Sequence, residues 1–96
     1  MYEISSNLYL KIAEAMMSQI GLRDYFSGVV YYTAGDVECR LLVTLFVERA
    51  TDIEEGSTYR RVTNLIPVWW EFSTIEGGVE LLNDFSFQTL RTTILG

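Results

Sequence analysis

Apolar residues recur at every fourth position near the start of the chain: Leu8, Ile12, Met16 and Ile20. This spacing places them on one face of a helix. The polar residues at positions 5 to 7 are suitable N-caps. Gly21 is suitable as the residue after the last turn, because glycine takes positive φ easily. The sequence therefore predicts one amphipathic helix between these signals, followed by a connecting turn over residues 22–28.

Two segments rich in β-branched and aromatic residues follow, Val29 to Ala34 and Val37 to Ala50. They flank Gly35-Asp36, a dipeptide that suits a two-residue type II′ hairpin turn. That turn places Tyr32 opposite Cys39 and so fixes which side chains share a face. The face predicted to lie in the core carries Val30, Tyr32, Val37, Cys39, Leu41, Val43, Leu45 and Val47.

A third strand is expected after a polar loop over Thr51 to Thr58. Pro67 interrupts this strand, and because proline cannot donate to a central ladder we expect a bulge or bend there that splits the strand into a piece before Ile66 and a piece after Val68. The strand then turns at Gly77-Gly78 and pairs with Val79 to Leu82. Trp70 is expected in the core and Trp69 on the opposite face, so the two tryptophans should differ sharply in exposure. The alternate positions predicted to face the core are Val62, Ile66, Val68, Trp70 and Phe72.

The last segment changes its period. Ser86 is a suitable N-cap for a helix in which Phe87, Leu90 and Ile94 share one face. Its three threonines lower helix propensity, so a fifth strand is the alternative. The predicted fold class is α+β: an N-terminal helix, an antiparallel β-meander of about four strands and a short C-terminal helix. The length of 96 residues predicts a single domain over residues 1–96.

Charge and composition argue against nucleic acid and membranes as partners and indicate a cellular compartment. Thirteen acidic and seven basic residues leave a net charge of −6, which opposes direct binding to nucleic acid. The chain lacks an apolar run near the roughly 18 residues that span a bilayer, so no membrane association is expected. No signal peptide is recognisable at the N-terminus. The single cysteine, Cys39, fits a reducing compartment, and we expect a cytoplasmic protein.

Little in the sequence supports catalysis. The chain has no histidine, which removes histidine-based triads and histidine metal ligands, and there is no phosphate-binding glycine loop. The acidic residues of the 51–58 loop lack the spacing of a calcium site. Glu71 and Asp84 would lie opposite each other across the Gly77-Gly78 turn, but nothing else completes a two-carboxylate site. We therefore predict a non-enzyme without a cofactor or a metal.

The second face of the predicted sheet is the most informative feature. A face exposed to water should be polar, yet this one mixes bulky apolar groups with arginine and tyrosine, as the centres of protein interfaces do. The alternative is that the C-terminal helix covers this face. The residues predicted to form the interface are Tyr31, Arg40, Leu42, Phe46, Arg61, Leu65 and Trp69.

These patterns predict a small interaction module that self-associates, as a homodimer, through this sheet face or through an exposed strand edge, and that also suits another protein partner. Two other functions stay open. One is a small-molecule binder or minor enzyme with a pocket between the first helix and the sheet. The other is an acidic inhibitor of a basic partner, which rests on net charge alone.

Overall fold

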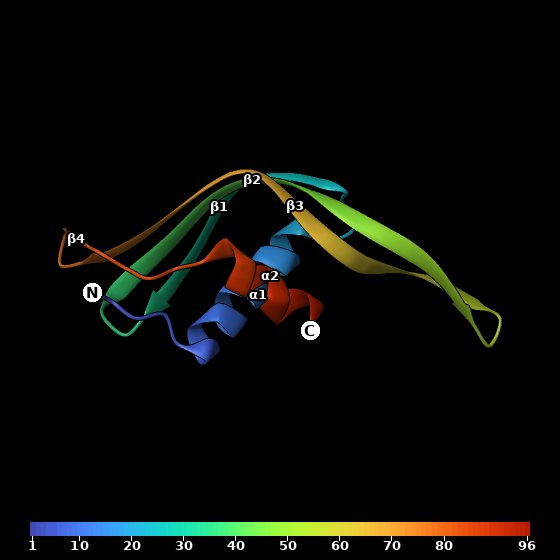
Figure 1. The fold of residues 1–96 in the computed structure, drawn as a ribbon, viewed down its shortest axis with the longest axis horizontal. Coiled ribbons are helices and arrows are strands. Elements are labelled where there is room, and N and C mark those ends of the chain that lie inside the picture. The colour runs from blue at the N-terminus through green and yellow to red at the C-terminus, as the bar shows by residue number, and fades with distance from the viewer.

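A computed structural model describes residues 1–96 and has the predicted α+β architecture (Figure 1). Four antiparallel strands form one sheet in the order β1-β2-β3-β4. No helix is long and apolar enough to cross a membrane. The elements are α1 (Ser6–Ile20), β1 (Tyr25–Ala34), β2 (Val37–Glu54), β3 (Ser57–Glu76), β4 (Val79–Leu81) and α2 (Phe87–Leu95).

The helix α1 begins and ends at its predicted signals, and α2 begins at the predicted one. The Ser5 hydroxyl accepts a hydrogen bond from the Leu8 amide, and Gly21 takes a φ of 58° just beyond α1. Ser86 caps α2 in the same way, accepting from the Thr89 amide. The C-terminal segment is therefore a helix and not a fifth strand.

The first hairpin has the predicted register. Gly35, with φ of 61°, and Asp36 form the turn, and Tyr32 lies opposite Cys39. However, β1 begins at Tyr25, inside the segment predicted to be a connecting turn. The β1–β2 pairing runs without interruption over ten residue pairs.

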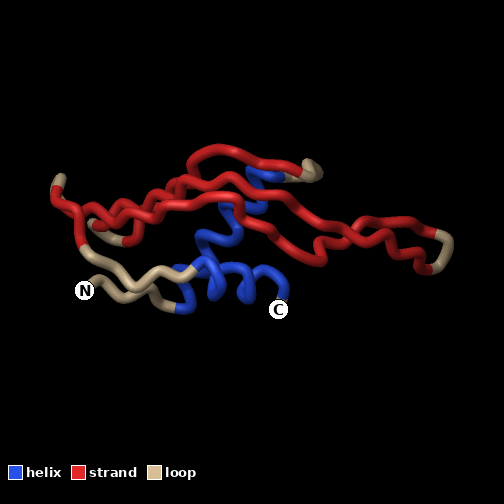
Figure 2. The backbone as a smooth tube through the Cα atoms, turned by 45° about the horizontal axis from the view of Figure 1, so that its top comes forward, coloured by secondary structure: helices blue, strands red, loops and turns tan.

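The second hairpin corrects the sequence interpretation. Residues 51–58 are not a loop, because β2 continues to Glu54 and β3 begins at Ser57. Glu55 and Gly56 form a two-residue turn with φ values of 49° and 81°, as a type I′ turn requires. The two strands project from the rest of the molecule and give it a long dimension of 52 Å (Figures 1 and 2). We call residues 48–64 the arm and the remainder the body.

A bulge occurs where Pro67 predicted one, but β3 continues through it and is not split into two pieces. The bulge changes which side chains face the core. Between Thr44 and Leu45 the partner on β3 moves from Trp69 to Pro67, so Val68 has no partner. Inserting one residue exchanges the faces of the residues that precede it. Leu65 is consequently fully buried, whereas Ile66 and Val68 are 42% and 63% exposed.

The expectation that Ile66 and Val68 face the core is therefore wrong, as is the placement of Leu65 on the other face. A second register shift, between Glu48 and Arg49, pairs Arg49 with Val62 and leaves Thr63 unmatched. This shift restores the original alternation. Val62 packs against the core as predicted.

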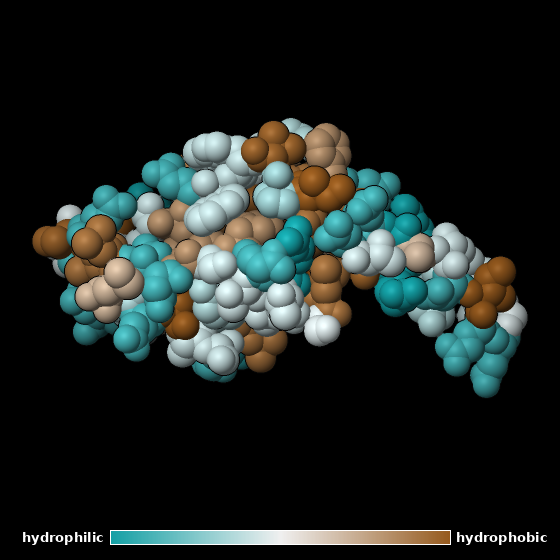
Figure 3. Space-filling view, viewed as in Figure 1, coloured by the Kyte–Doolittle hydropathy of each residue, from teal (hydrophilic) through white to brown (hydrophobic).

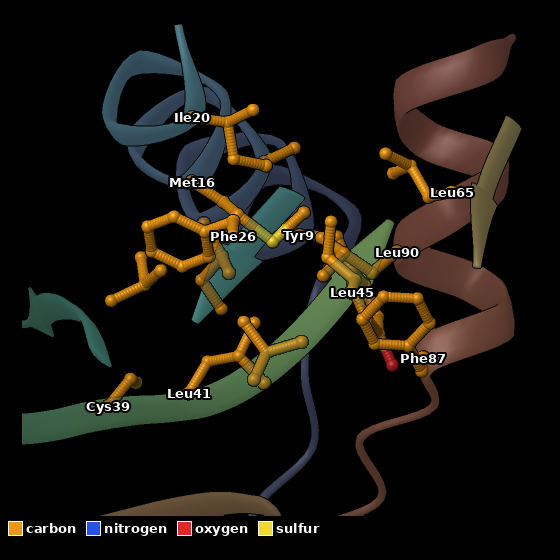
Figure 4. Packing of buried hydrophobic residues seen from close by; sticks show 14 of the residues in the cluster. Tyr9, Met16, Ile20, Phe26, Cys39, Leu41, Leu45, Leu65, Phe87 and Leu90 are labelled. Atoms are coloured by element: carbon orange, nitrogen blue, oxygen red, sulfur yellow. The ribbon is translucent and has the colours of Figure 1, made fainter. Parts of the chain in front are cut away.

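The core lies between the sheet and the two helices, which cover the same face of the sheet (Figures 1 and 4). Leu41, Val43 and Leu45 of β2 are at its centre. Leu65 packs beside Leu90 of α2 (Figure 4). Burial of these apolar side chains is the main force that holds the helices to the sheet.

Trp70 is less buried than predicted. Its ring points to the helix side, where it lies 5.4 Å from the ring of Phe85 and 6.2 Å from that of Phe87. It nevertheless remains 39% exposed, against 51% for Trp69. The predicted sharp difference in exposure between the tryptophans is wrong, because α2 crosses beside Trp70 without covering the whole indole.

Candidate interaction surface

The second face of the sheet carries no helix. We call it the outer face. Cross-strand pairing arranges its side chains in rows of three: Tyr25, Phe46 and Ile66; Ser27, Thr44 and Trp69; Val29, Leu42 and Glu71; Tyr31, Arg40 and Ser73. Figure 3 shows apolar side chains along the top of the molecule, on the side away from the helices of Figure 1.

The first two rows contain no charged residue and hold large exposed rings. Tyr25 and Phe46 are each 49% exposed, and their ring centroids lie 5.2 Å apart. Trp69 occupies the next row, and Val68 is exposed at the bulge beside it. Together with Ile66 these residues form the aromatic patch, a term we keep for Tyr25, Phe46, Ile66, Val68 and Trp69.

Polar side chains within and around the patch form hydrogen bonds with one another. The hydroxyls of Ser27 and Thr44 lie 2.8 Å apart and satisfy each other within the second row. Arg40 Nε donates to Glu38 Oε1 at 3.2 Å, and this hydrogen bond, reinforced by the carboxylate charge, raises the pKa of Arg40. Glu48 and Glu71 lie at the two ends of the patch. The patch is thus an uncharged strip between charged borders.

The structure places six of the seven predicted interface residues on the outer side of the sheet: Tyr31, Arg40, Leu42, Phe46, Trp69 and Arg61, which lies opposite Ala50. Arg61 lies apart, on the arm, where its Nε donates to Asp52 Oδ2 at 2.8 Å and its pKa is raised by that bond and charge. Leu65 lies in the core under α2. The assignment of Leu65 to the interface is therefore wrong, whereas Arg61 has the predicted face but lies on the arm, beyond the aromatic patch.

Sequence reasoning missed Tyr25, Ile66 and Val68 of the patch. Tyr25 fell in the segment interpreted as a turn, although its aromatic ring and the Phe26 that follows are typical of a strand. Ile66 and Val68 were assigned to the wrong face. The signal that could have placed Ile66 was Pro67 itself, since a bulge of one residue reverses the alternation beyond it.

Small hollows lie at the margins of the molecule. The space between α1 and the sheet is filled by side chains such as Ile12, Met16 and Leu41, each at most 1% exposed. The largest hollow, about 560 Å³, lies where the arm meets the body and is lined by Leu22, Arg49, Thr58, Tyr59 and Arg60. A second, about 480 Å³, is bounded by the N-terminal residues and β4.

The acidic residues singled out in the sequence do not converge on a site. Asp52 is paired with Arg61, and Glu54 accepts a hydrogen bond from the Tyr59 hydroxyl. No group of three or more histidine, cysteine, aspartate or glutamate side chains is placed to hold a metal ion. β4 ends at Leu81, so the register that would oppose Glu71 and Asp84 is not continued. Asp84 instead accepts from the Ile4 amide at 2.8 Å.

No protein-family model matches this chain, and comparisons with curated proteins and with solved structures also find no match.

Proposed function

We propose that this chain is a non-catalytic protein-interaction module that self-associates through the aromatic patch of its outer face. The observation that carries the proposal is the pair of uncharged rows with half-exposed rings on a sheet face that no helix covers. Contiguous exposed apolar side chains of this kind are typical of interaction sites. A second copy of the chain is a suitable first occupant, because a two-fold axis buries each patch against an identical one.

The residues in and around the patch favour specific association over non-specific aggregation. Phe46 and Trp69 supply large rings with few rotatable bonds, the type of residue that dominates the energy of interfaces. Arg40 stands at the border, already oriented by Glu38. A border of charged groups contributes to specificity and orientation more than to affinity. The net charge of −6 weakens association at low salt, so we expect moderate salt to strengthen it.

Phe46→Glu tests the proposal, with Ile53→Glu as its control. Phe46 is 49% exposed at the centre of the patch, and Ile53 is 77% exposed near the tip of the arm, so both changes place one negative charge on an exposed strand position. We expect Phe46→Glu to weaken association by at least about 30-fold, corresponding to about 2 kcal/mol for a central residue. Ile53→Glu should leave it unchanged.

Sedimentation equilibrium between about 1 and 100 μM, a range that covers moderate homomeric affinities, gives the mass of each protein. Phe46→Glu should halve the mass of the wild-type assembly while circular dichroism and the urea midpoint stay unchanged. A monomeric wild type overturns the proposal. It is also overturned if the mass is the same with glutamate at position 46, or if Ile53→Glu lowers it equally.

A further inference from the structure

A second binding feature is the free edge of β1. This strand is the last of the sheet, and Figures 1 and 2 show no segment beyond it. An edge strand exposes a row of unpaired amides and carbonyls that can add another strand. The direction of these groups follows from two hydrogen bonds. The Asp24 carbonyl accepts from the Val47 amide of β2, and the Val29 carbonyl accepts from the side-chain amide of Gln19.

Backbone groups of an antiparallel strand alternate between its two neighbours. Since Asp24 is directed toward β2, even-numbered residues of β1 bond to β2 and odd-numbered residues face the open edge. The contact between Val29 and Gln19 agrees, because it uses an odd-numbered carbonyl. Odd-numbered β1 residues from Tyr25 to Thr33 therefore present their amides and carbonyls outward. Gln19 satisfies one of these carbonyls from an exposed position, where another donor can replace it.

The edge lacks the usual features that prevent pairing. Natural edge strands are protected by charged side chains, proline, bulges or short length. β1 has ten residues without a charge or a proline, and its pairing with β2 has no bulge. Both register shifts of the sheet lie between β2 and β3. In a chain with 21% charged residues and a net charge of −6, this strand can approach an identical strand without direct charge repulsion.

We propose that the β1 edge pairs antiparallel with the β1 edge of a second copy, which joins the two sheets into one. The pairing that uses the outward groups most fully centres on Val29. It sets Ser27 opposite Tyr31 of the second copy and Tyr25 opposite Thr33 of the second copy, which allows roughly ten backbone hydrogen bonds. The side chains that meet on the outer face are then uncharged throughout. The joined sheet also extends the outer face across both copies.

This inference goes beyond the proposed function because it uses backbone groups at an edge, not side chains on a face. The two-fold axis of the edge pair is perpendicular to the sheet, whereas the axis of a face-to-face contact lies parallel to it. Perpendicular two-fold axes that meet close an assembly of four copies. With both contacts the wild type is a tetramer, and each contact alone gives a dimer.

Val29→Pro tests the edge directly. Proline removes the outward amide of Val29 and is compatible with an edge strand whose amide faces solvent. Val29→Ala is the control, since it shortens the side chain but keeps the amide. In sedimentation equilibrium, Val29→Pro should reduce four copies to two, Phe46→Glu should do the same, and the double variant should be a monomer. Val29→Ala should retain the wild-type mass.

Amide hydrogen exchange supplies a test that does not require a proline variant to fold. It is measured by NMR on Phe46→Glu, so that outer-face contact does not shield the strand. The amides of Ser27, Val29 and Tyr31 should exchange more slowly as protein concentration rises, by about 15-fold at a total concentration about 100 times the Kd, where about 7% of the chains remain unpaired. The even-numbered amides of Gly28 and Val30 should be protected at every concentration, because they bond to β2.

The outcomes separate the two proposals. If the assembly mass falls with Val29→Pro but not with Phe46→Glu, the result supports pairing through the β1 edge and overturns association through the outer face. The reverse result, with fast exchange of the odd-numbered amides at all concentrations, overturns the edge and leaves the face. A heterologous strand as the true occupant would give the same fast exchange in the isolated protein, and would likewise overturn pairing with a second copy.

Discussion

Arg49 Nε lies 3.1 Å from Asp24 Oδ1 and joins the base of the arm to the turn between α1 and β1. The same guanidinium donates to the carbonyls of Gly21 and Arg23 at 3.0 and 2.9 Å. Its side chain is 5% exposed. A cation here also interacts favourably with the C-terminal end of the helix dipole of α1. Arg49 thus anchors both the arm and the end of the helix.

Replacing Arg49 with methionine should lower the free energy of unfolding by about 1.5 to 3 kcal/mol, the usual effect of losing hydrogen bonds to a charged group. Asp24 is 58% exposed and can be hydrated, but the two carbonyls lose their donor. Urea denaturation measures the change. Arg61→Met is the control, because the exposed Arg61–Asp52 pair lies on the same arm, and it should leave the midpoint unchanged. Equal effects of the two substitutions would show that Arg49 is no anchor.

The sequence predicted the elements well because each has a local signal. Ser5 and Gly21 mark the ends of α1, and Gly35-Asp36 and Gly77-Gly78 form the expected turns. These signals act within a few residues, so they need no knowledge of the distant parts of the chain.

The errors came from features that pairing across the sheet decides. A bulge at Pro67 was expected, but its effect on Leu65 and Ile66 depends on exactly one residue being left without a partner. The arm was missed because TDIEEGST is polar, and only the positive φ of Glu55 and Gly56 makes it a tight hairpin. Phe46 and Trp69 of the aromatic patch were therefore predicted from the sequence. Tyr25, Ile66 and Val68 beside them were missed.

Trp70→Ala should have an intermediate effect on stability. A fully buried tryptophan contributes about 3 to 5 kcal/mol, and because Trp70 is 39% exposed we expect a loss nearer 2 kcal/mol. Leu45→Ala, at a fully buried position, should cost more, and Trp69→Ala should cost least. Urea denaturation of the three variants gives the order. A larger effect for Trp69 than for Trp70 would contradict the assignment of Trp70 to the helix side.

The turn of the arm predicts a stabilising substitution. Glu55 has a φ of 49°, a conformation that costs an ordinary L-residue about 1 kcal/mol and that asparagine accepts more readily. Glu55→Asn should therefore slow amide hydrogen exchange in the arm, with little change in the body. Glu55→Gln removes the same charge without the conformational preference, and serves as the control. If Glu55→Gln slows exchange in the arm as much as Glu55→Asn does, the charge of Glu55, and not its positive φ, destabilises the turn.

The thiol of Cys39, near the start of β2, is 1% exposed, and burial, with a smaller contribution from Glu38, raises its pKa above the ordinary value of 9.0. The folded protein therefore keeps the thiol protonated at a pH where the unfolded chain releases the proton. The unfolded state gains free energy from that ionisation. Stability contributed by the neutral thiol is complete below pH 9 and declines as the pH rises toward the folded-state value.

Cys39→Ala should consequently change the pH dependence of stability as well as its size. At pH 7.5 the wild type should be more stable than the variant, because alanine leaves a small cavity. Between pH 8.5 and 10.5 this advantage should shrink, at a rate that approaches about 1.4 kcal/mol per pH unit while the folded thiol stays protonated. Comparing the two proteins cancels the titration of other groups, which both share. Urea denaturation across this range measures the difference, and an advantage that stays constant with pH would mean that Cys39 ionises equally in the folded and unfolded chains.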